Sequence, residues 1–293
     1  MDQNNLPHAI SRGSGPTEGQ SIALVPWWSI TKSVLAAATL RLVDQGRLSL
    51  DDCCNGRPYT IRQLLQHTSG LNNYGGAAYR EAVAAGDPVW PVAELLARVK
   101  AERLIFTPGR DWAYSNVGYI FVRQRIEEAA GLEIGEALRI LVFAPMDIRR
   151  TRIATTPEDM KQTFWGNPDG YDPNWVYHGL LIGPPSDAVD FLRRLFSESF
   201  LSESARSAMK TMHALGGSIA GRPWTRIGYG LGLMMGEMGD AGTAFGHSGV
   251  GHDCVSSLYW FSELPGSPVV AVFGQGTDEG ITETEAVRLA TGR

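Results

Sequence analysis

Ser29 and Lys32 place a hydroxyl and an amine three residues apart. On a helix this spacing puts both side chains on one face, where the amine could take the proton of a serine nucleophile. Ser29 stands where that helix would begin, so free backbone N–H groups and the positive end of the helix dipole would help to stabilise negative charge. The same spacing recurs at Ser207 and Lys210 in what reads as a surface helix, so the motif alone identifies no nucleophile.

Tyr114 and Asn116 form a second candidate segment, just ahead of an apolar helical run. A phenol near a lysine is pushed towards phenolate, because the ammonium favours the charged form, and could then take a proton from a serine. The amide of Asn116 can bond both to Lys32 and to a substrate amide. Taken alone, the segment is also typical of a core tyrosine followed by a helix cap.

A glycine-rich segment, Gly246–Gly251, precedes a predicted strand and contains His247, Gly249 and Val250. Glycines let a backbone approach a ligand closely, and a free N–H there could form half of an oxyanion hole. His247 adds a donor that titrates near neutral pH. The alternative for this segment alone is a turn that leads into the strand.

The elements that must position these residues differ along the chain. Residues 29–45 predict a buried helix that is apolar on most sides and ends before Gly46. Further helical patterns are Thr60–Gln66, Pro91–Lys100, Asn116–Ala130, Ser186–Phe196 and Ile281–Ala290. Short β-rich segments are Gly228–Met235, Val255–Ser262 and Pro268–Phe273, the last two joined as a hairpin through Glu263–Gly266.

Helices first and an antiparallel sheet last predict an α+β fold, in which helices flank the sheet and a mainly helical domain is added. We expect a discontinuous α/β sheet domain from 1–57 and 222–293, and a mainly helical domain from 58–221.

Composition excludes several classes of protein. The chain has 293 residues, of which 43% are hydrophobic and 19% charged, as in a folded globular protein. A net charge of -5 and the lack of a basic run argue against a nucleic-acid partner. The apolar stretch from Ser33 to Leu40 is about half of the ~20 residues that a membrane span needs. Residues 1–20 lack the apolar core of a secretory signal, so the sequence as given indicates a cytoplasmic protein unless a leader was removed.

No metal or cofactor is expected. The three cysteines do not suggest a disulfide framework. His247, His252 and Cys254 match no paired zinc spacing, so a buried thiol and two unrelated histidines are the simpler interpretation.

Taken in order, the three motifs resemble those of the serine β-lactamase and penicillin-binding-protein superfamily. The similar branch holds class C β-lactamases, D-alanyl-D-alanine carboxypeptidases, D-aminopeptidases and family VIII esterases. It is marked by S-x-x-K, then Y-x-N, then K-T-G or H-x-G, which stand here as Ser29/Lys32, Tyr114/Asn116 and His247/Gly249. Similar context surrounds them at 46–52, 60–71 and 108–109, and the resemblance extends from Ser29 to Phe273.

The resemblance implies an acyl-enzyme mechanism with Ser29 as the nucleophile. Lys32 and Tyr114 would share the proton transfers, and which of them is the formal base stays open because coupled groups titrate as a unit. Asn116 would orient the substrate and Lys32. The backbone N–H groups of Ser29 and Val250 would form the oxyanion hole. This chemistry requires no cofactor, and His67 reads as a turn residue.

Two features depart from the family pattern. His247 replaces a lysine and is only partly charged near pH 7, so it would hold a substrate carboxylate less firmly and makes penicillin hydrolysis less expected. Only 28 residues precede Ser29, so the N-terminal strands of the family are predicted to be shortened or missing. The sheet edge left open would pair with another copy of the chain as a homo-oligomer, or be covered by residues 1–20.

The sequence therefore predicts a serine hydrolase for small esters or D-amino-acid amides and peptides. The alternative is a penicillin-binding or ligand-binding member that is acylated without efficient turnover. The segment around Ser248 falls one residue short of the G-x-S-x-G elbow and leads into a strand, which excludes an α/β-hydrolase. Trp27, Trp28 and Trp112 lie next to motif residues and favour an aromatic-walled pocket.

Overall fold

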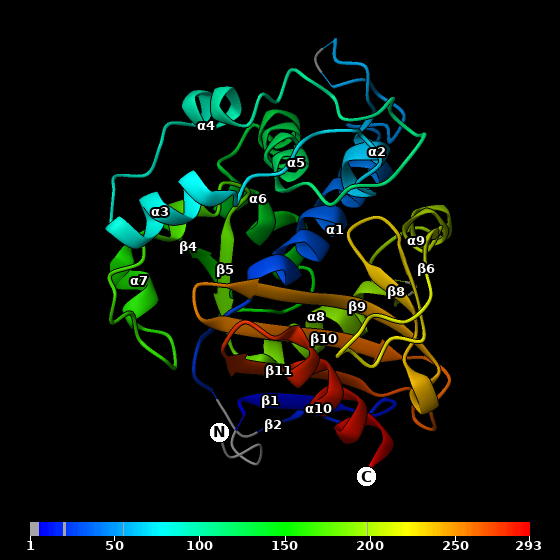
Figure 1. Cartoon of the computed structure of the whole chain (residues 1–293). Helices are drawn as coiled ribbons and strands as arrows, with labels where there is room; N and C mark the ends of the chain where they lie inside the picture. The colour runs from blue at the N-terminus through cyan, green and yellow to red at the C-terminus, as the bar shows by residue number, and fades with distance from the viewer. Residues whose placement is uncertain (1–5, 20–21, 55, 198) are drawn as a thin grey trace.

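An eight-stranded antiparallel sheet crosses the molecule in a computed structural model that describes residues 6–19, 22–54, 56–197 and 199–293. Its strand order is β2-β1-β11-β10-β9-β8-β7-β6 (Figure 1). The strands are β1 (His8–Ser11), β2 (Glu18–Gly19), β6 (His213–Gly216), β7 (Arg226–Tyr229), β8 (Met234–Glu237), β9 (Thr243–Gly251), β10 (Cys254–Phe261) and β11 (Val269–Gln275). A smaller antiparallel sheet, in the order β3-β5-β4, contains β3 (Val25–Pro26), β4 (Arg152–Ala154) and β5 (Leu180–Gly183).

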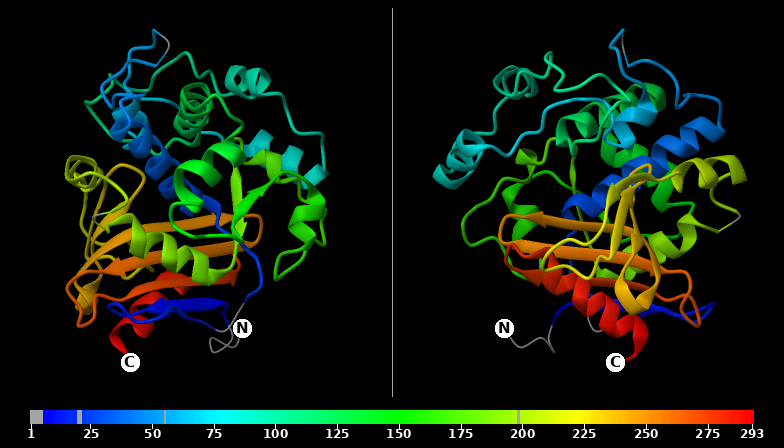
Figure 2. Two further views of the ribbon diagram at one scale, coloured as in Figure 1. Left: turned by 180° about the vertical axis from the view of Figure 1, so that it is seen from behind. Right: turned by 45° about the vertical axis from the view of Figure 1, so that its right-hand side comes forward.

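Helices cover both faces of the large sheet. Figure 1 shows α10 (Glu279–Thr291) on one face, and the view from behind in Figure 2 shows α8 (Pro185–Leu195) on the other. Side chains alternate between the faces of a strand, so Val270 and Val272 of β11 pack in one cluster with Ala286 of α10. Phe273 points to the opposite face and belongs to the main core.

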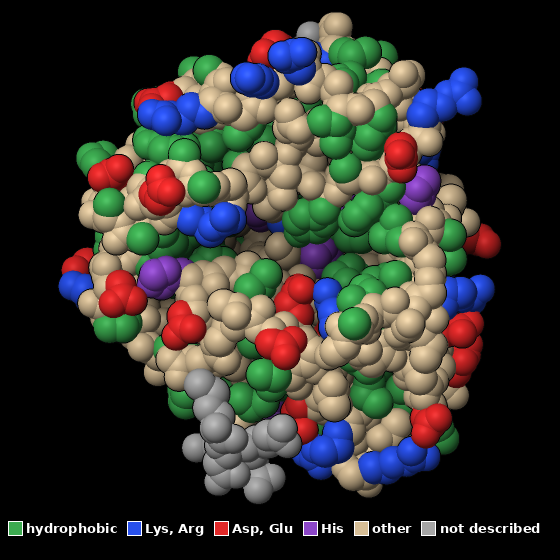
Figure 3. Space-filling view, in the orientation of Figure 1, with side chains coloured by type: hydrophobic (Ala, Val, Ile, Leu, Met, Phe, Trp, Pro, Cys, Tyr) green, Lys and Arg blue, Asp and Glu red, His purple; other side chains and the backbone are tan. Residues whose placement is uncertain are grey.

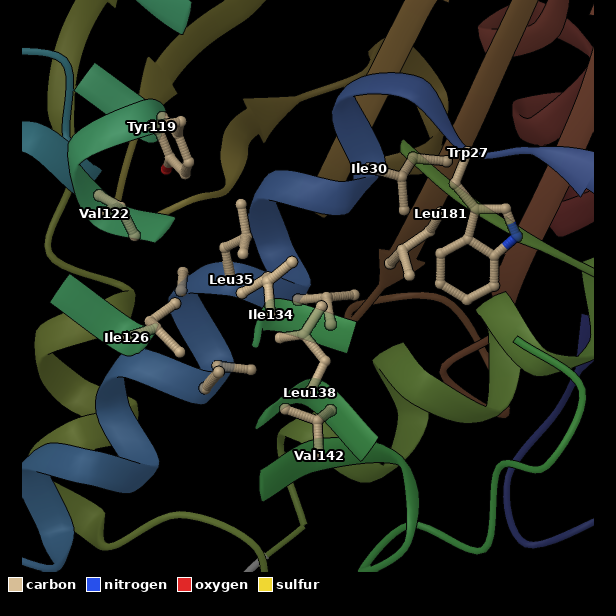
Figure 4. Close-up of a cluster of buried hydrophobic side chains, with 14 of the residues drawn as sticks. Trp27, Ile30, Leu35, Tyr119, Val122, Ile126, Ile134, Leu138, Val142 and Leu181 are labelled. Carbon is tan, nitrogen blue, oxygen red and sulfur yellow. The ribbon is translucent and has the colours of Figure 1, made fainter. Parts of the chain in front are cut away.

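The buried helix α1 (Thr31–Asp44) is the centre of the helical part. It follows the 3-10 turn η2 (Trp28–Ile30), and helices α5 (Asn116–Ala130) and α6 (Ile134–Leu138) pack around it. Figure 4 shows Leu35 of α1 among Ile126, Ile134 and Leu138. The remaining helices and turns are α2 (Ile61–Leu65), α3 (Ala77–Ala85), α4 (Val92–Arg98), η3 (Arg139–Phe143), α7 (Pro157–Lys161), η4 (Pro173–Trp175), α9 (Glu203–Met209) and η5 (Gly239–Ala241).

The predicted α+β class, with an antiparallel sheet and flanking helices, is confirmed. The β10–β11 hairpin also forms as expected. The single strand predicted at Gly228–Met235 is wrong, because the chain turns back between β7 and β8: the Gly230 N–H donates to the Leu233 carbonyl at 2.8 Å, and Gly232 takes a positive φ of 70°.

The segment Gly246–Gly251 belongs to strand β9 and is not a turn. Its glycines have low intrinsic strand preference, but β8 and β10 pair with it on both sides. Tertiary pairing therefore overrides the local preference.

The N-terminal strands are short but present. Strand β1 pairs with β11 through His8↔Val272 and Ser11↔Val269, and β2 pairs with β1. The tail thus covers the edge of β11 that was expected to lie open, which removes the reason for a second copy to pair there. Residues 1–5 and 20 of that tail lie outside the described residues.

The division into 1–57 with 222–293 and 58–221 stays a prediction. Two elements of the range 58–221 belong with the large sheet: β6 is its edge strand, and α8 packs on its face. Within the described residues, no helix has the length and apolar character needed to cross a membrane.

Candidate active site

The Ser29 hydroxyl lies between an amine and a phenol. Lys32 Nζ donates to Ser29 Oγ at 3.0 Å, and the Tyr114 hydroxyl donates to the same oxygen at 2.8 Å. Ser29 belongs to η2, Lys32 to the first turn of α1, and Tyr114 to the loop before α5. The structure thus brings together three side chains from two distant segments, with the serine oxygen at their centre.

The backbone around Ser29 is held in a tight turn by strand β9. Trp28 has a φ of 45°, a left-handed conformation that strains a bulky residue and occurs mainly where function requires it. A Cβ on Gly251 would lie 2.1 Å from the Trp28 ring, and one on Gly249 would lie 2.7 Å from the Ser29 nitrogen. Glycine at both positions is what lets the β9 backbone contact the turn that carries Ser29.

Tyr114 is positioned by a helix cap and a buried histidine. Ser115 caps α5, its Oγ accepting from the Gly118 N–H at 3.1 Å. His67 does lie in a turn, with a φ of 62°, but it is fully buried and its Nδ1 accepts from the Ser115 N–H at 3.1 Å. The His67 and Tyr114 rings pack with their centroids 4.3 Å apart, so His67 supports the phenol.

Burial acts on the amine and the phenol in opposite directions. Lys32 is 0% exposed, and desolvation lowers the pKa of its ammonium well below the ordinary value, which favours a neutral amine. Burial raises the pKa of Tyr114, and the hydrogen bond to Ser29 offsets only part of this. The expected shift of Tyr114 towards phenolate is therefore wrong, because burial disfavours the charged form of the phenol.

His247 lies buried in β9 and is neutral. Desolvation by burial lowers the pKa of His247 to about 3, so the expectation of a partly charged imidazole near pH 7 is wrong. Its Nδ1 faces the Ser248 carbonyl and must donate, so Nε2 accepts from the Tyr229 hydroxyl at 2.8 Å. This ring offers no positive charge to a substrate carboxylate.

A buried ion pair fixes β9 behind His247. Glu283 of α10 is fully buried and accepts from Arg222 Nε at 2.7 Å. The same carboxylate accepts hydrogen bonds from Trp224 and from Ser248 of β9. The residue next to His247 is thereby tied to the helix on the outer face of the sheet.

A cavity of about 510 Å³ opens beside Ser29 (Figure 3 shows the hollowed face). Asn116, the first residue of α5, and Val250, which is 44% exposed, lie in its wall. Its aromatic wall consists of Trp28, Tyr74, Tyr79 and Tyr171. The other side chains that line it are Arg80, Val83, Ala84, Val176, His178 and His252.

Of the three tryptophans predicted to wall the pocket, Trp28 does so. Trp27 is a core residue whose indole N–H donates to the Gly183 carbonyl at 3.2 Å. Trp112 packs against the rings of His67 and Tyr114 and does not line the cavity.

Sequence analysis missed His178, which lies just before β5 with its Nε2 3.2 Å from Lys32 Nζ. In the described part of the chain, the hydrogen bonds of Lys32 Nζ go to Ser29 and His178, and not to Asn116 as expected. The only sequence signal for His178 is a polar residue between two apolar runs, 175–177 and 180–182, which is more often a core histidine than a functional one.

The neutral histidines predict how stability depends on pH. Burial lowers the pKa of His67, His178 and His247 below their unfolded value of about 6.5. Below that pH the unfolded chain therefore binds protons at these histidines that the native chain does not bind. The contribution of these histidines to stability is therefore full above about pH 6.5 and falls as the pH drops towards 3, by up to about 1.4 kcal/mol per pH unit for each histidine. Burial raises the pKa of Asp187 and Glu279, so these two carboxyls act in the opposite direction and stabilise the native chain at low pH. They are fewer than the three histidines, so we expect a net loss of stability.

Urea unfolding at pH 7.5 and pH 5.5 checks this prediction. We expect a lower midpoint at pH 5.5 with an unchanged slope. An equal or higher midpoint at pH 5.5 would mean that these imidazoles are protonated in the native protein.

The Beta-lactamase family model matches residues 21–283. Penicillin-binding protein 4* of Bacillus subtilis (strain 168) is 26% identical over 253 residues, which cover 75% of this chain and 54% of that protein. Esterase EstB of Burkholderia gladioli is 31% identical over 142 residues, 41% of this chain and 36% of the esterase.

Solved structures agree with this similarity. The D-stereospecific amidohydrolase from Streptomyces sp. has a TM-score of 0.78 and 25% identity, over 98% of this chain and 94% of that chain. The chain spans about half the length of the first curated relatives it matches, 54% and 50%.

Proposed function

The chain belongs to the Beta-lactamase family, and from that premise we propose that it is a serine hydrolase that forms an acyl-enzyme on Ser29. Its relatives include an esterase and an amidohydrolase, which supports a hydrolase of this fold. The observation that carries the proposal is the Ser29 oxygen, held 3.0 Å from Lys32 Nζ and 2.8 Å from the Tyr114 hydroxyl at the side of a cavity.

Lys32 is the base in acylation. As a neutral amine it takes the Ser29 proton while Oγ bonds to the carbonyl carbon of the substrate. Tyr114 is protonated and gives its proton to the departing oxygen or nitrogen, and the Lys32 ammonium then returns a proton to Tyr114. Deacylation reverses these transfers, with water in place of the leaving group.

The remaining predicted residues bind the substrate. Backbone N–H groups of Ser29 and Val250 stabilise the oxyanion, and the lack of room for a Cβ between Gly249 and the Ser29 nitrogen supports this pairing of β9 with the turn. Asn116 orients the substrate from the cavity wall. Because His247 is neutral, binding favours small esters and D-amino-acid amides over penicillins, which carry a carboxylate.

The aromatic wall of the cavity receives the acyl group. Burying a phenyl ring is worth roughly 1.5–3 kcal/mol, which corresponds to about 10- to 100-fold in rate. We expect p-nitrophenyl phenylacetate to be hydrolysed with a kcat/KM about 10- to 100-fold above that of p-nitrophenyl acetate, over many turnovers. Continuous release of nitrophenol measures both.

Filling the cavity is the control. Val83→Trp places bulk among the lining residues and should lower the preference for the phenylacetyl ester while leaving the acetyl ester almost unchanged. A single stoichiometric burst on every ester would favour the alternative, a member that is acylated without turnover. A preference that Val83→Trp does not alter would place the acyl group elsewhere.

A further inference from the structure

His178 is a buried histidine that the catalytic motifs leave unexplained. It is 3% exposed, and its Nε2 lies 3.2 Å from Lys32 Nζ. Its Nδ1 lies 3.5 Å from the Tyr74 hydroxyl, at the outer limit of a hydrogen bond. The ring therefore lies between the amine of α1 and a tyrosine of the loop before α3.

The partners of the ring determine its tautomer. A neutral imidazole has one N–H and one lone pair. In the tautomer in which Nε2 accepts an N–H of Lys32, the hydrogen is on Nδ1 and points to Tyr74. The side chains that face the ring are Lys32 from α1, Tyr74, and Tyr119 of α5, with the charge of Arg123 and the neutral imidazoles of His247 and His67 further away.

A lysine that acts as a base here becomes an ammonium in a dry site. Among the described residues, no carboxylate forms an ion pair with Lys32. The charge would be met instead by the His178 lone pair and by the faces of Tyr114 and Tyr119, whose ring centroids are 5.1 and 5.5 Å from Nζ. Neutral acceptors stabilise the ammonium as it forms without holding the resting amine protonated.

We propose that His178 is a positioning residue for Lys32: by accepting one N–H of the amine, it holds the Lys32 nitrogen beside Ser29, where the amine can take the hydroxyl proton. This inference rests on the proposed role of Lys32 as the base. His178 also supports the ammonium in the tetrahedral intermediate. It takes up no proton itself.

Three replacements of His178 test the proposal through the pH profile of kcat/KM for p-nitrophenyl phenylacetate. His178→Leu removes the acceptor, so kcat should fall about 10- to 100-fold with little change in KM, and the acid limb should move to lower pH. His178→Glu adds a negative charge that favours the Lys32 ammonium, so the acid limb should move to higher pH. His178→Gln retains an acceptor and should recover much of the lost kcat.

Opposite shifts for Leu and Glu are the decisive readout, because a merely structural histidine would not move the limb in two directions. His8→Leu is the control, since His8 lies on β1 outside the cavity, and the acid limb of this variant should stay in place. Thermal unfolding of each variant checks its folding, and His178→Gln keeps the test decisive if the other two fail to fold.

The outcomes separate this proposal from the proposed function. If wild-type protein turns over but all three variants keep its limb and kcat, His178 does not position Lys32. A rise in KM with an unmoved limb would instead make His178 a substrate contact. If wild-type protein shows no hydrolysis at all, the proposed function fails first.

Discussion

Ser29→Ala should lower kcat for p-nitrophenyl phenylacetate by about 10⁴- to 10⁶-fold, because removal of a nucleophilic oxygen leaves only binding and oxyanion stabilisation. The oxygen lost is the one that accepts from both Lys32 and Tyr114. Steady-state release of nitrophenol by both proteins, corrected for a mock purification from cells without the gene, measures the loss. The thermal midpoint should stay close to that of the wild type, because the fold around Ser29 is fixed by α1 and β9.

The chain supplies its own control for this experiment. Ser207 and Lys210 repeat the S-x-x-K spacing at the end of α9, and both side chains are exposed. Ser207→Ala should keep the full rate. A Ser29→Ala protein that retains more than about one part in a hundred of the wild-type rate would place the nucleophile elsewhere.

Lys32→Met separates activity from stability. The variant removes the base and should lower kcat by about 10²- to 10⁴-fold, the range typical of general-base catalysis. Methionine keeps most of the side-chain length and buries no amine, so the free energy of unfolding should rise, since an amine desolvated at 0% exposure opposes folding.

Urea unfolding and ester hydrolysis, measured on the same preparation, check both halves of this expectation. Lys210→Met, on the surface copy of the motif, should change neither quantity. A Lys32→Met protein that is both inactive and less stable would show that the ammonium is a structural charge, and an active one would remove Lys32 from the mechanism.

Local pattern was enough to predict the elements that carry the site. The segment 29–45 is apolar on most sides, which is typical of a helix buried all round, and α1 has that environment. The two separate strands within Gly228–Met235 could not be predicted from local pattern, because the turn between them is also apolar. They are distinguished by their partners, since β7 pairs with β6 and β8 pairs with β9. Strand β9 was missed because its glycines have low strand preference. Gly249 and Gly251 leave room for Ser29 and Trp28, which is a tertiary requirement and not a local one.

The candidate site divides in the same way. Ser29, Lys32 and Tyr114 stand in spacings that predict chemistry, and the structure brings them within hydrogen-bond distance. Charge states were not readable from spacing, because the neutral His247 and the protonated Tyr114 follow from burial. His178 comes from a segment about 60 residues after Asn116 and meets Lys32 only through tertiary packing.

Intact-protein mass spectrometry, with peptide mapping, tests the acyl-enzyme on Ser29 most directly. Protein quenched in acid during turnover of p-nitrophenyl phenylacetate, and protein incubated with benzylpenicillin, are compared with Ser29→Ala treated in the same way. We expect the phenylacetyl ester to add one acyl group, mapped to the peptide that contains Ser29, in the wild type and not in the variant. Hydrolysis without any adduct on Ser29, or an adduct that Ser29→Ala still acquires, would contradict the mechanism.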